Sequence, residues 1–357
     1  MRNGLPVAKR AILSAAITAL VMWVLLYAPT PYLVYEPGIA IPVQDMIEAD
    51  TEASEHSDQG QFLLTAVKLT EPNFWNVLAA GIDRDRDVYL KSDVFGGVTQ
   101  RQYAKRLTVI MEGSQNDAIE AAYRYLHLAY EVETKAIVVT DVKRIGDKPV
   151  SSLRPGDKLL GLSEGDDFLN VGDAAQKVFS ALAGLKDNGI ISIKAEREKK
   201  PFLVQLAKPK SQEAEQSGEA YLAALLGVAG FTELRAIEPQ EQEHRLAIAA
   251  GEIGGPSAGL VFALGAVDLL TEGSLAGSAT IAATGTIDGD GKVGAIGGIR
   301  QKVVATSREQ AGLFLVPKAN EKEARAKAEA IGTDMKVQGV ETLQEAIEAI
   351  ASYNGSR

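Results

Sequence analysis

The chain contains no cysteine, which excludes disulfide bonds, thiolate nucleophiles and cysteine metal sites. Histidine is almost as scarce. His56, His127 and His244 lie far apart among unrelated neighbours, a pattern that favours solvated or structural side chains over metal ligands. We therefore expect no metal site and no cofactor. A serine nucleophile in this chain would have to find its base elsewhere than in a histidine.

Positive charge is also in short supply. The formal net charge is −10 at pH 7, so no broad basic surface is available to neutralise phosphates, and general nucleic-acid binding is not expected. A nucleotide-binding P-loop is missing too. The string that ends in Gly291-Lys292 has Thr286 where the motif needs its first glycine, and Val293 where it needs serine or threonine. We expect no ATPase and no requirement for ATP.

One string imitates a calcium loop without completing it. Asp83, Asp85 and Asp87 alternate as the first ligands of such a loop do. Val88 stands where the loop needs its glycine, and Val94 where it needs the bidentate glutamate. The string is interpreted as a solvated turn.

A long uncharged run is present only near the N-terminus. Residues 11–29 are apolar apart from two hydroxyl side chains, follow a basic flank, and suffice to cross most of a hydrocarbon core. Trp23 and Tyr27 mark its far end, as an interfacial aromatic belt would. We predict a cytoplasmic N-terminus at 1–10, a single-pass anchor in the cell membrane at 11–29 and an extracytoplasmic body. A cleavable signal peptide is the alternative, although the small-x-small cleavage pattern is poor.

The segment after the anchor, 30–125, is predicted to be a juxtamembrane α+β region without visible chemistry. Residues 62–69 have the pattern of a strand, Asn73 can cap a short helix through Leu78, and apolar residues at helical spacing predict a helix over 117–130.

Residues 126–207 resemble a PDZ domain. Strands are predicted over 136–142, 153–160, 190–195 and 202–206, with a helix over 171–185. The Leu-x-x-Gly-Asp-x-Leu-Leu turn, Leu153 to Leu160, is the part that matches. The resemblance implies that a peptide adds a strand to a sheet edge beside the helix. Val132 to Lys135 stand where the glycine-rich carboxylate-binding loop belongs, so capture of a free C-terminus is not implied. A small spacer domain is the alternative, and 208–217 is predicted to be a polar linker.

The remaining part, 218–357, has the pattern of an α/β domain. Strands are predicted over 278–286 and 313–316, and a hairpin over 287–293 turns at Asp290-Gly291. A helix is predicted from 297 onward. Asn320-x-x-Glu323 and Thr342-x-x-Glu345 resemble capping boxes of two final helices.

Ser257 lies in the string Glu-Ile-Gly-Gly-Pro-Ser-Ala-Gly, which runs from Glu252 to Gly259. Glycines permit a tight turn, and Pro256 suits the first position of a helix. Unpaired N–H groups and the positive end of the helix dipole then lie beside the hydroxyl, which suits a nucleophile whose attack generates an oxyanion. A plain turn with a serine helix cap is the alternative.

A lysine can supply the base that the histidines do not. Lys302 follows Gly297-Gly298 in the first turns of a predicted helix, between the apolar Ile299 and Val303. Burial and the positive end of the helix dipole would both lower its pKa, leaving a neutral amine that can accept a proton. A solvated lysine is the alternative for this residue on its own.

Three motifs now occur in order: Gly-Gly-Pro-Ser257-Ala-Gly, Ala-Thr284-Gly-Thr and Gly-Gly-Ile-x-x-Lys302. In order and spacing they resemble the proteolytic domain of Lon-type serine proteases. Together with the anchor and the PDZ-like segment, the chain resembles the membrane-anchored PDZ-Lon proteases of Gram-positive bacteria. The expected architecture is therefore α/β and α+β multidomain: a transmembrane helix, a PDZ-like domain and a C-terminal Lon-type proteolytic domain.

The resemblance implies roles for individual residues. Ser257 would be the nucleophile, Lys302 the general base, and Thr284 the residue that helps to hold the lysine. Backbone N–H groups of Ser257 and of Gly254 or Gly255 would form the oxyanion hole. Gly254 departs from the acidic residue of ATP-dependent Lon enzymes and resembles the PDZ-linked branch.

The predicted function is an ATP-independent serine endopeptidase with a Ser-Lys dyad. It would process peptides or accessible protein segments at the extracytoplasmic face of the membrane, with substrates docked by the PDZ-like domain. A homo-oligomeric ring is left open. The alternative function is a catalytically silent, membrane-anchored scaffold that binds peptide partners.

Overall fold

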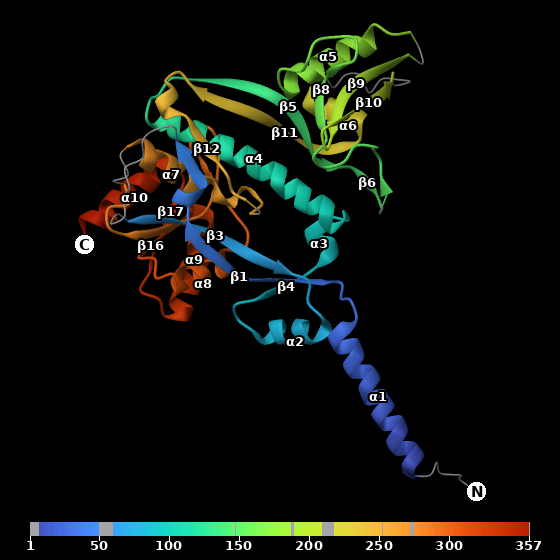
Figure 1. Cartoon of the computed structure of the whole chain (residues 1–357), viewed down its shortest axis with the longest axis vertical. Coiled ribbons are helices and arrows are strands. Elements are labelled where there is room, and N and C mark those ends of the chain that lie inside the picture. Colours follow the sequence, from blue (N-terminus) through green and yellow to red (C-terminus); the bar gives the residue numbers. More distant parts are fainter. Residues whose placement is uncertain are drawn as a thin grey trace.

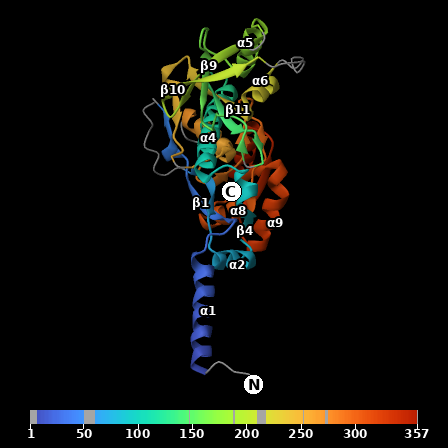
Figure 2. The same cartoon turned by 90° about the vertical axis from the view of Figure 1, so that its right-hand side faces the viewer.

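The computed structural model describes residues 7–49, 60–146, 148–186, 189–208, 218–251, 253–271 and 275–356. His56, Glu252, most of the predicted linker and part of the predicted cytoplasmic N-terminus lie outside these ranges. The molecule is elongated. A single long helix stands at one end, a mixed α/β body occupies the centre, and a smaller sheet with its own helices forms the other end (Figures 1 and 2).

The long helix α1 (Val7–Tyr27) is built almost wholly from apolar side chains, and it ends before Pro29. Its stretch Lys9–Tyr27 has a mean hydropathy of 1.9, and none of it is buried inside the protein. This is the only part of the described residues that is long and apolar enough to cross a membrane. A signal sequence has the same properties, so the predicted anchor stays a prediction.

The central body is built on a six-stranded sheet with the order β17-β16-β13-β3-β1-β4. The first four strands are parallel, and β1 and β4 run antiparallel to their neighbours. The strands are β1 (Tyr32–Pro42), β3 (Gln61–Thr70), β4 (Asp87–Leu90), β13 (Thr280–Ala283), β16 (Leu313–Pro317) and β17 (Lys336–Val340).

Helices cover both faces of this sheet because alternate strand side chains point to opposite sides. Phe62 and Leu64 of β3 pack with α4 (Gln100–Tyr125), α7 (Gly259–Leu270) and α10 (Leu343–Gly355), whereas Leu63 packs on α8 (Ile299–Arg308) and α9 (Glu321–Ile331). The strand pattern predicted for 62–69 is confirmed. So are the Asn73-capped helix α2 (Phe74–Ile82) and the strand over 313–316.

The predicted domain limits at 125 and 218 differ from the packing. β1 and β3 come from the predicted juxtamembrane region, yet they belong to the sheet of β13, β16 and β17. The helix predicted over 117–130 begins at Gln100, after a Thr99–Gln102 capping box, and ends at Tyr125. The prediction covered only the second half of this helix, although Tyr103, Leu107 and Met111 recur at helical spacing in the first half as well.

The smaller sheet is antiparallel, with the order β10-β9-β8-β5-β11. It comprises β5 (Tyr130–Val142), β8 (Lys158–Leu162), β9 (Ile190–Arg197), β10 (Lys200–Ala207) and β11 (Val228–Pro239), with the helices α5 (Val171–Ala183) and α6 (Glu219–Leu226). The strands and helix expected within 126–207 are present. β11 was not expected, and it pairs along β5, which therefore has neighbours on both sides.

Short elements complete the fold, and two capping predictions have different outcomes. Thr342 caps α10 by accepting from the N–H of Glu345, as predicted, but the Glu345 side chain accepts from the N–H of Glu341 and not from that of Thr342, so the box is half formed. Asn320 does not cap α9, because its side chain bonds both backbone groups of Ile296 instead. Within the described residues, the other elements are β2 (Ile47–Ala49), α3 (Lys91–Phe95), β6 (Arg144–Ile145), β7 (Lys148–Pro149), β12 (Leu246–Ile248), β14 (Thr286–Ile287), β15 (Val293–Gly294) and the short 3-10 turns Gln44–Met46, Gln242–His244, Pro256–Ala258 and Lys318–Asn320.

Candidate active site

The serine singled out by the sequence lies in a single 3-10 turn, Pro256–Ala258, which leads directly into α7. Gly255 precedes the turn with φ +93°, a conformation that favours glycine. The carbonyl of Ser257 accepts hydrogen bonds from the N–H of Gly285 (2.9 Å) and the hydroxyl of Thr284 (3.0 Å). The turn is thereby attached to the end of β13, and the side chain of Ser257 remains partly exposed.

Lys302 reaches the serine from the opposite face of the sheet. It lies in α8, where the chain enters the helix through Gly298 at φ +69°, and it is only 1% exposed. Its Nζ lies 2.9 Å from Ser257 Oγ, 2.9 Å from Thr284 Oγ1 and 2.8 Å from the carbonyl oxygen of Thr65. Ser257 and Lys302 come from opposite faces of the sheet. They can meet because β13 ends at Ala283 and no longer separates them.

The protonation of Lys302 follows from this environment. None of its three hydrogen-bond partners carries a charge, and burial removes the water that would stabilise an ammonium group. Burial lowers the pKa of Lys302 to about 7. A large part of the lysine population is therefore neutral near pH 7.

The hydrogen bonds also determine the direction of each proton. A neutral amine has two hydrogens and one lone pair. The Thr65 carbonyl can only accept, and Thr284 gives its own hydrogen to Ser257 O, so both must accept from Nζ. The lone pair is left for the third neighbour, the hydroxyl of Ser257. In this state the serine donates to the lysine, which is the arrangement that proton abstraction requires.

Thr65 is a member of the site that the sequence did not indicate. It lies in β3, is 2% exposed, and contributes its backbone carbonyl rather than its side chain. Any residue type can supply a carbonyl, so no motif marks the position. The strand predicted over 62–69 contained Thr65, but nothing local connected that strand with a lysine 237 residues away.

The predicted oxyanion hole needs one correction. The N–H of Gly255 donates to the carbonyl of Leu107 in α4 at 3.0 Å, so it is occupied inside the protein. Gly255 therefore serves the turn through its positive φ and its bond to α4, and it is not a free donor. Ser257 and Gly254 remain as the predicted backbone donors.

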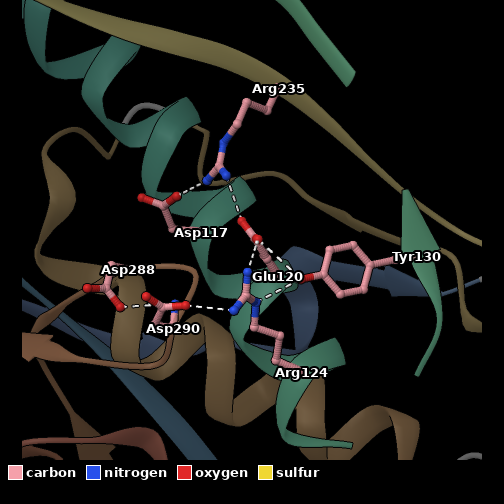
Figure 3. A network of polar contacts seen from close by, with 7 residues as sticks. All are labelled: Asp117, Glu120, Arg124, Tyr130, Arg235, Asp288 and Asp290. Carbon is pink, nitrogen blue, oxygen red and sulfur yellow. Dashed lines mark hydrogen bonds and ion pairs between the residues drawn. The ribbon is translucent and has the colours of Figure 1, made fainter. Parts of the chain in front are cut away.

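A network of charged side chains joins three elements near this site (Figure 3). Arg235 of β11 bridges Asp117 and Glu120 of α4, and Arg124 of the same helix bonds Glu120 and Asp290. Asp290 lies in the turn between β14 and β15, whose first strand follows Thr284 closely. Burial raises the pKa of Asp117 to about 6. The network connects strand β11 of the smaller sheet, helix α4 and the β14–β15 hairpin.

The three aspartates of the false calcium loop have partners within the chain. Asp87 bonds Arg300 and Gln301 of α8, and Asp85 bonds Lys327 of α9. Asp83 accepts from the N–H of Asp85 and closes the turn. These contacts hold α8 and α9 against the segment that follows α2.

The segment that contains the site matches a known protein family. Residues 240–352 match the Lon protease (S16) C-terminal proteolytic domain. This segment contains Ser257, Thr284 and Lys302, so the resemblance predicted from the three motifs is confirmed for it. The PDZ-like domain, the membrane anchor and the Gram-positive type stay predictions.

Curated Lon proteases are similar over part of the chain. The chain is 37% identical over 113 residues to the peroxisomal Lon protease homolog 2 of Caenorhabditis elegans, a match that covers 31% of this chain and 14% of that protein. It is 33% identical over 103 residues to a Lon protease of Fervidobacterium nodosum, covering 29% and 12%. A Lon protease of Haemophilus influenzae is 33% identical over 93 residues, covering 26% and 11%. The chain spans about one seventh of the length of these relatives or less.

Proposed function

We propose that this protein is a serine endopeptidase that uses a Ser257–Lys302 dyad and needs no ATP. The observation that supports it best is the 2.9 Å contact between Ser257 Oγ and the Nζ of a lysine that is 1% exposed. A serine hydroxyl needs an adjacent base to become a nucleophile, and a desolvated lysine supplies one. The match of this segment to the Lon proteolytic domain supports the same chemistry.

In the proposed reaction, neutral Lys302 takes the hydroxyl proton as Ser257 Oγ attacks the scissile carbonyl carbon. Lys302 then gives this proton to the leaving amine, and the C–N bond breaks to leave an acyl-enzyme. A water molecule, deprotonated by Lys302, attacks the ester and releases the second product. Thr65 and Thr284 keep Nζ directed at Oγ throughout, because each holds one of its hydrogens.

The negative oxygen of the tetrahedral intermediate would be bound by backbone N–H groups. Ser257 opens a helical turn, where the first N–H groups lack partners inside the helix. The positive end of the α7 dipole adds to this stabilisation. We assign the donors to Ser257 and Gly254, since Gly255 is already bonded to Leu107.

The location and the substrates belong to the same proposal. With α1 as a membrane anchor, the catalytic body would stand on the extracytoplasmic side, as the basic flank predicts. No phosphate-binding loop is present to drive unfolding, so cleavage would be limited to peptides and accessible segments. Docking by the smaller sheet would use one of its two outer strands, β10 or β11, since β5 has strands on both sides.

Cleavage by the purified full chain in lipid nanodiscs tests the proposal. We expect hydrolysis of unfolded casein without ATP, and no turnover in Ser257→Ala and Lys302→Arg, because arginine does not deprotonate. Lys292→Arg changes an exposed lysine and is the matched control, with activity retained. Full activity in Lys302→Arg would contradict the proposed base. Absence of cleavage in the wild type would favour the scaffold, and loss of activity with a chelator would favour a metallopeptidase.

A further inference from the structure

Helix α2 (Phe74–Ile82) presents an apolar face to its surroundings. Trp75, Leu78 and Ile82 are 57%, 59% and 86% exposed, and their spacing of three and four residues places them on one side of the helix. The opposite side contacts the protein body, where Ala80 is buried. Both sides of the helix are therefore apolar.

The composition of α2 is unusual for a helix in water. Its nine residues, Phe-Trp-Asn-Val-Leu-Ala-Ala-Gly-Ile, include no charged side chain, whereas a helix on a soluble surface carries charged or polar residues on its outer face. Outward-facing tryptophan and leucine are typical of helices that lie in a membrane interface.

The position of α2 is fixed by contacts with the end of α1. The side chain of Asn73 caps α2 by accepting from the N–H of Asn76 (2.8 Å), and it donates to the carbonyl of Leu26 in the last turn of α1 (3.0 Å). The hydroxyl of Thr30, just beyond α1, donates to the carbonyl of Pro72 (2.8 Å). α2 thus begins at the level where α1 ends, and it extends sideways from that point (Figures 1 and 2).

We propose that α2 is an interfacial membrane helix whose Trp75, Leu78 and Ile82 insert into the lipid surface. The inference rests on the proposed anchoring by α1. If α1 spans the bilayer, its end lies at the boundary between acyl chains and headgroups, and the contacts of Asn73 hold α2 at that depth. The exposed faces of α1 and α2 are then continuous, and one bilayer covers both. The helix would fix the height and tilt of the catalytic body above the membrane.

The chain contains two tryptophans, Trp23 in α1 and Trp75 in α2, and this permits separate readouts. The full chain is reconstituted in phosphatidylcholine vesicles brominated at either shallow or deep acyl positions. Trp23→Phe leaves Trp75 as the only reporter, and we expect its fluorescence to be quenched most by shallow bromines and protected from aqueous iodide. Trp75→Phe leaves Trp23, which reports insertion of α1.

The two reporters separate the two proposals. Quenching of Trp23 without quenching of Trp75 would leave the anchor in place and overturn the role of α2. Absence of quenching at both positions would overturn the anchor and the inference that rests on it. Protection of Trp75 from iodide without quenching by bromine would mean that a protein partner or a second copy covers α2, which also overturns the inference.

Charge on the apolar face gives a second measurement. In the Trp23→Phe background, Leu78→Asp with Ile82→Asp should abolish quenching of Trp75, because carboxylates oppose insertion. The same pair in the Trp75→Phe background should leave quenching of Trp23 unchanged. Leu203→Asp, at a 58% exposed leucine of β10, is the matched control and should alter neither signal. Undiminished quenching of Trp75 in the double variant would contradict insertion of this face.

Discussion

At the scale of single residues, the site depends on how one buried amine divides its hydrogen bonds. Lys302 has three polar neighbours, and two of them can only accept from it. Burying a lysine disfavours its charged form, so the protein destabilises the ammonium group in order to hold a base. The same geometry leaves the hydroxyl of Ser257 as the donor.

The activity should follow the protonation of Lys302. Because its pKa is lowered to about 7, the neutral fraction falls as the pH drops below that value. We expect kcat/KM for a peptide to fall about tenfold per pH unit on the acid side and to level off above pH 8. Steady-state kinetics from pH 5 to 9 test this. An acid limb that is absent, or centred near pH 10, would contradict a lysine with a lowered pKa.

Thr284 should matter through its hydroxyl. Thr284→Val keeps the shape but removes both the acceptor for Lys302 and the donor to Ser257 O, so we expect kcat to fall by roughly ten- to a hundredfold. Thr284→Ser retains the hydroxyl and should keep most of the activity. The acid limb of the pH profile should move only in the valine variant. Equal losses in both variants would indicate a packing role.

Residue chemistry singled out Ser257 and Lys302, the resemblance to Lon-type domains added Thr284, and neither indicated Thr65. Serine, threonine and lysine chemistry can be recognised in sequence, since each role needs a particular side chain. Thr65 acts through a carbonyl that every residue possesses, so only the fold reveals it. Gly255 shows the converse: the sequence predicted a donor, and tertiary contact with Leu107 occupies it.

At the scale of elements, local patterns predicted most strands and helices of the proteolytic segment but not their ends or partners. The apolar stretch 62–69 marked β3, and Pro256 after two glycines marked the start of the helical segment that leads into α7. The first half of α4 was missed, although it holds apolar residues at helical spacing. That half holds Leu107, the residue that binds the loop before the nucleophile.

The loop before Ser257 should tolerate alanine only at positions where φ is negative. Gly255 has φ +93°, so Gly255→Ala introduces backbone strain of about 1–3 kcal/mol beside Ser257. We expect its kcat to fall by at least tenfold while circular dichroism stays unchanged. Gly81→Ala is the matched control, since Gly81 has no positive φ and nothing near an added Cβ. Normal activity of Gly255→Ala would show that the turn need not be held as described.

At the scale of the whole molecule, the two sheets are joined through α4 rather than through a flexible hinge. β5 follows α4 directly, and Arg235 of β11 returns to Asp117 and Glu120. The predicted limit at 218 failed to capture this, because β11 lies beyond it and pairs with β5, and strand pairing between distant segments leaves no local pattern. Helix α4 therefore packs with both the catalytic body and the smaller sheet.

The ion pairs of Arg235 with Asp117 and Glu120 should contribute measurably to the stability of the fold. Arg235→Met leaves Glu120, which is 6% exposed, with less compensation for its charge, so we expect a clear fall in the midpoint of thermal unfolding. Arg245→Met breaks an exposed pair with Glu238 (53% and 51% exposed) and should change the midpoint little. Differential scanning calorimetry of both variants tests this. Similar midpoints for the two would mean that the network does not hold the sheets together.

The residues of the candidate site are far apart in the sequence, so the ribosome synthesises them at different times. Thr65 leaves the ribosome 237 residues before Lys302, and Ser257 leaves it 45 residues before. In the proposed dyad, a nascent chain would therefore carry the nucleophile for some time without its base. Until α8 has been synthesised and packed against β3, the serine would be an ordinary hydroxyl. The order of translation alone would keep the proposed site inactive over that interval.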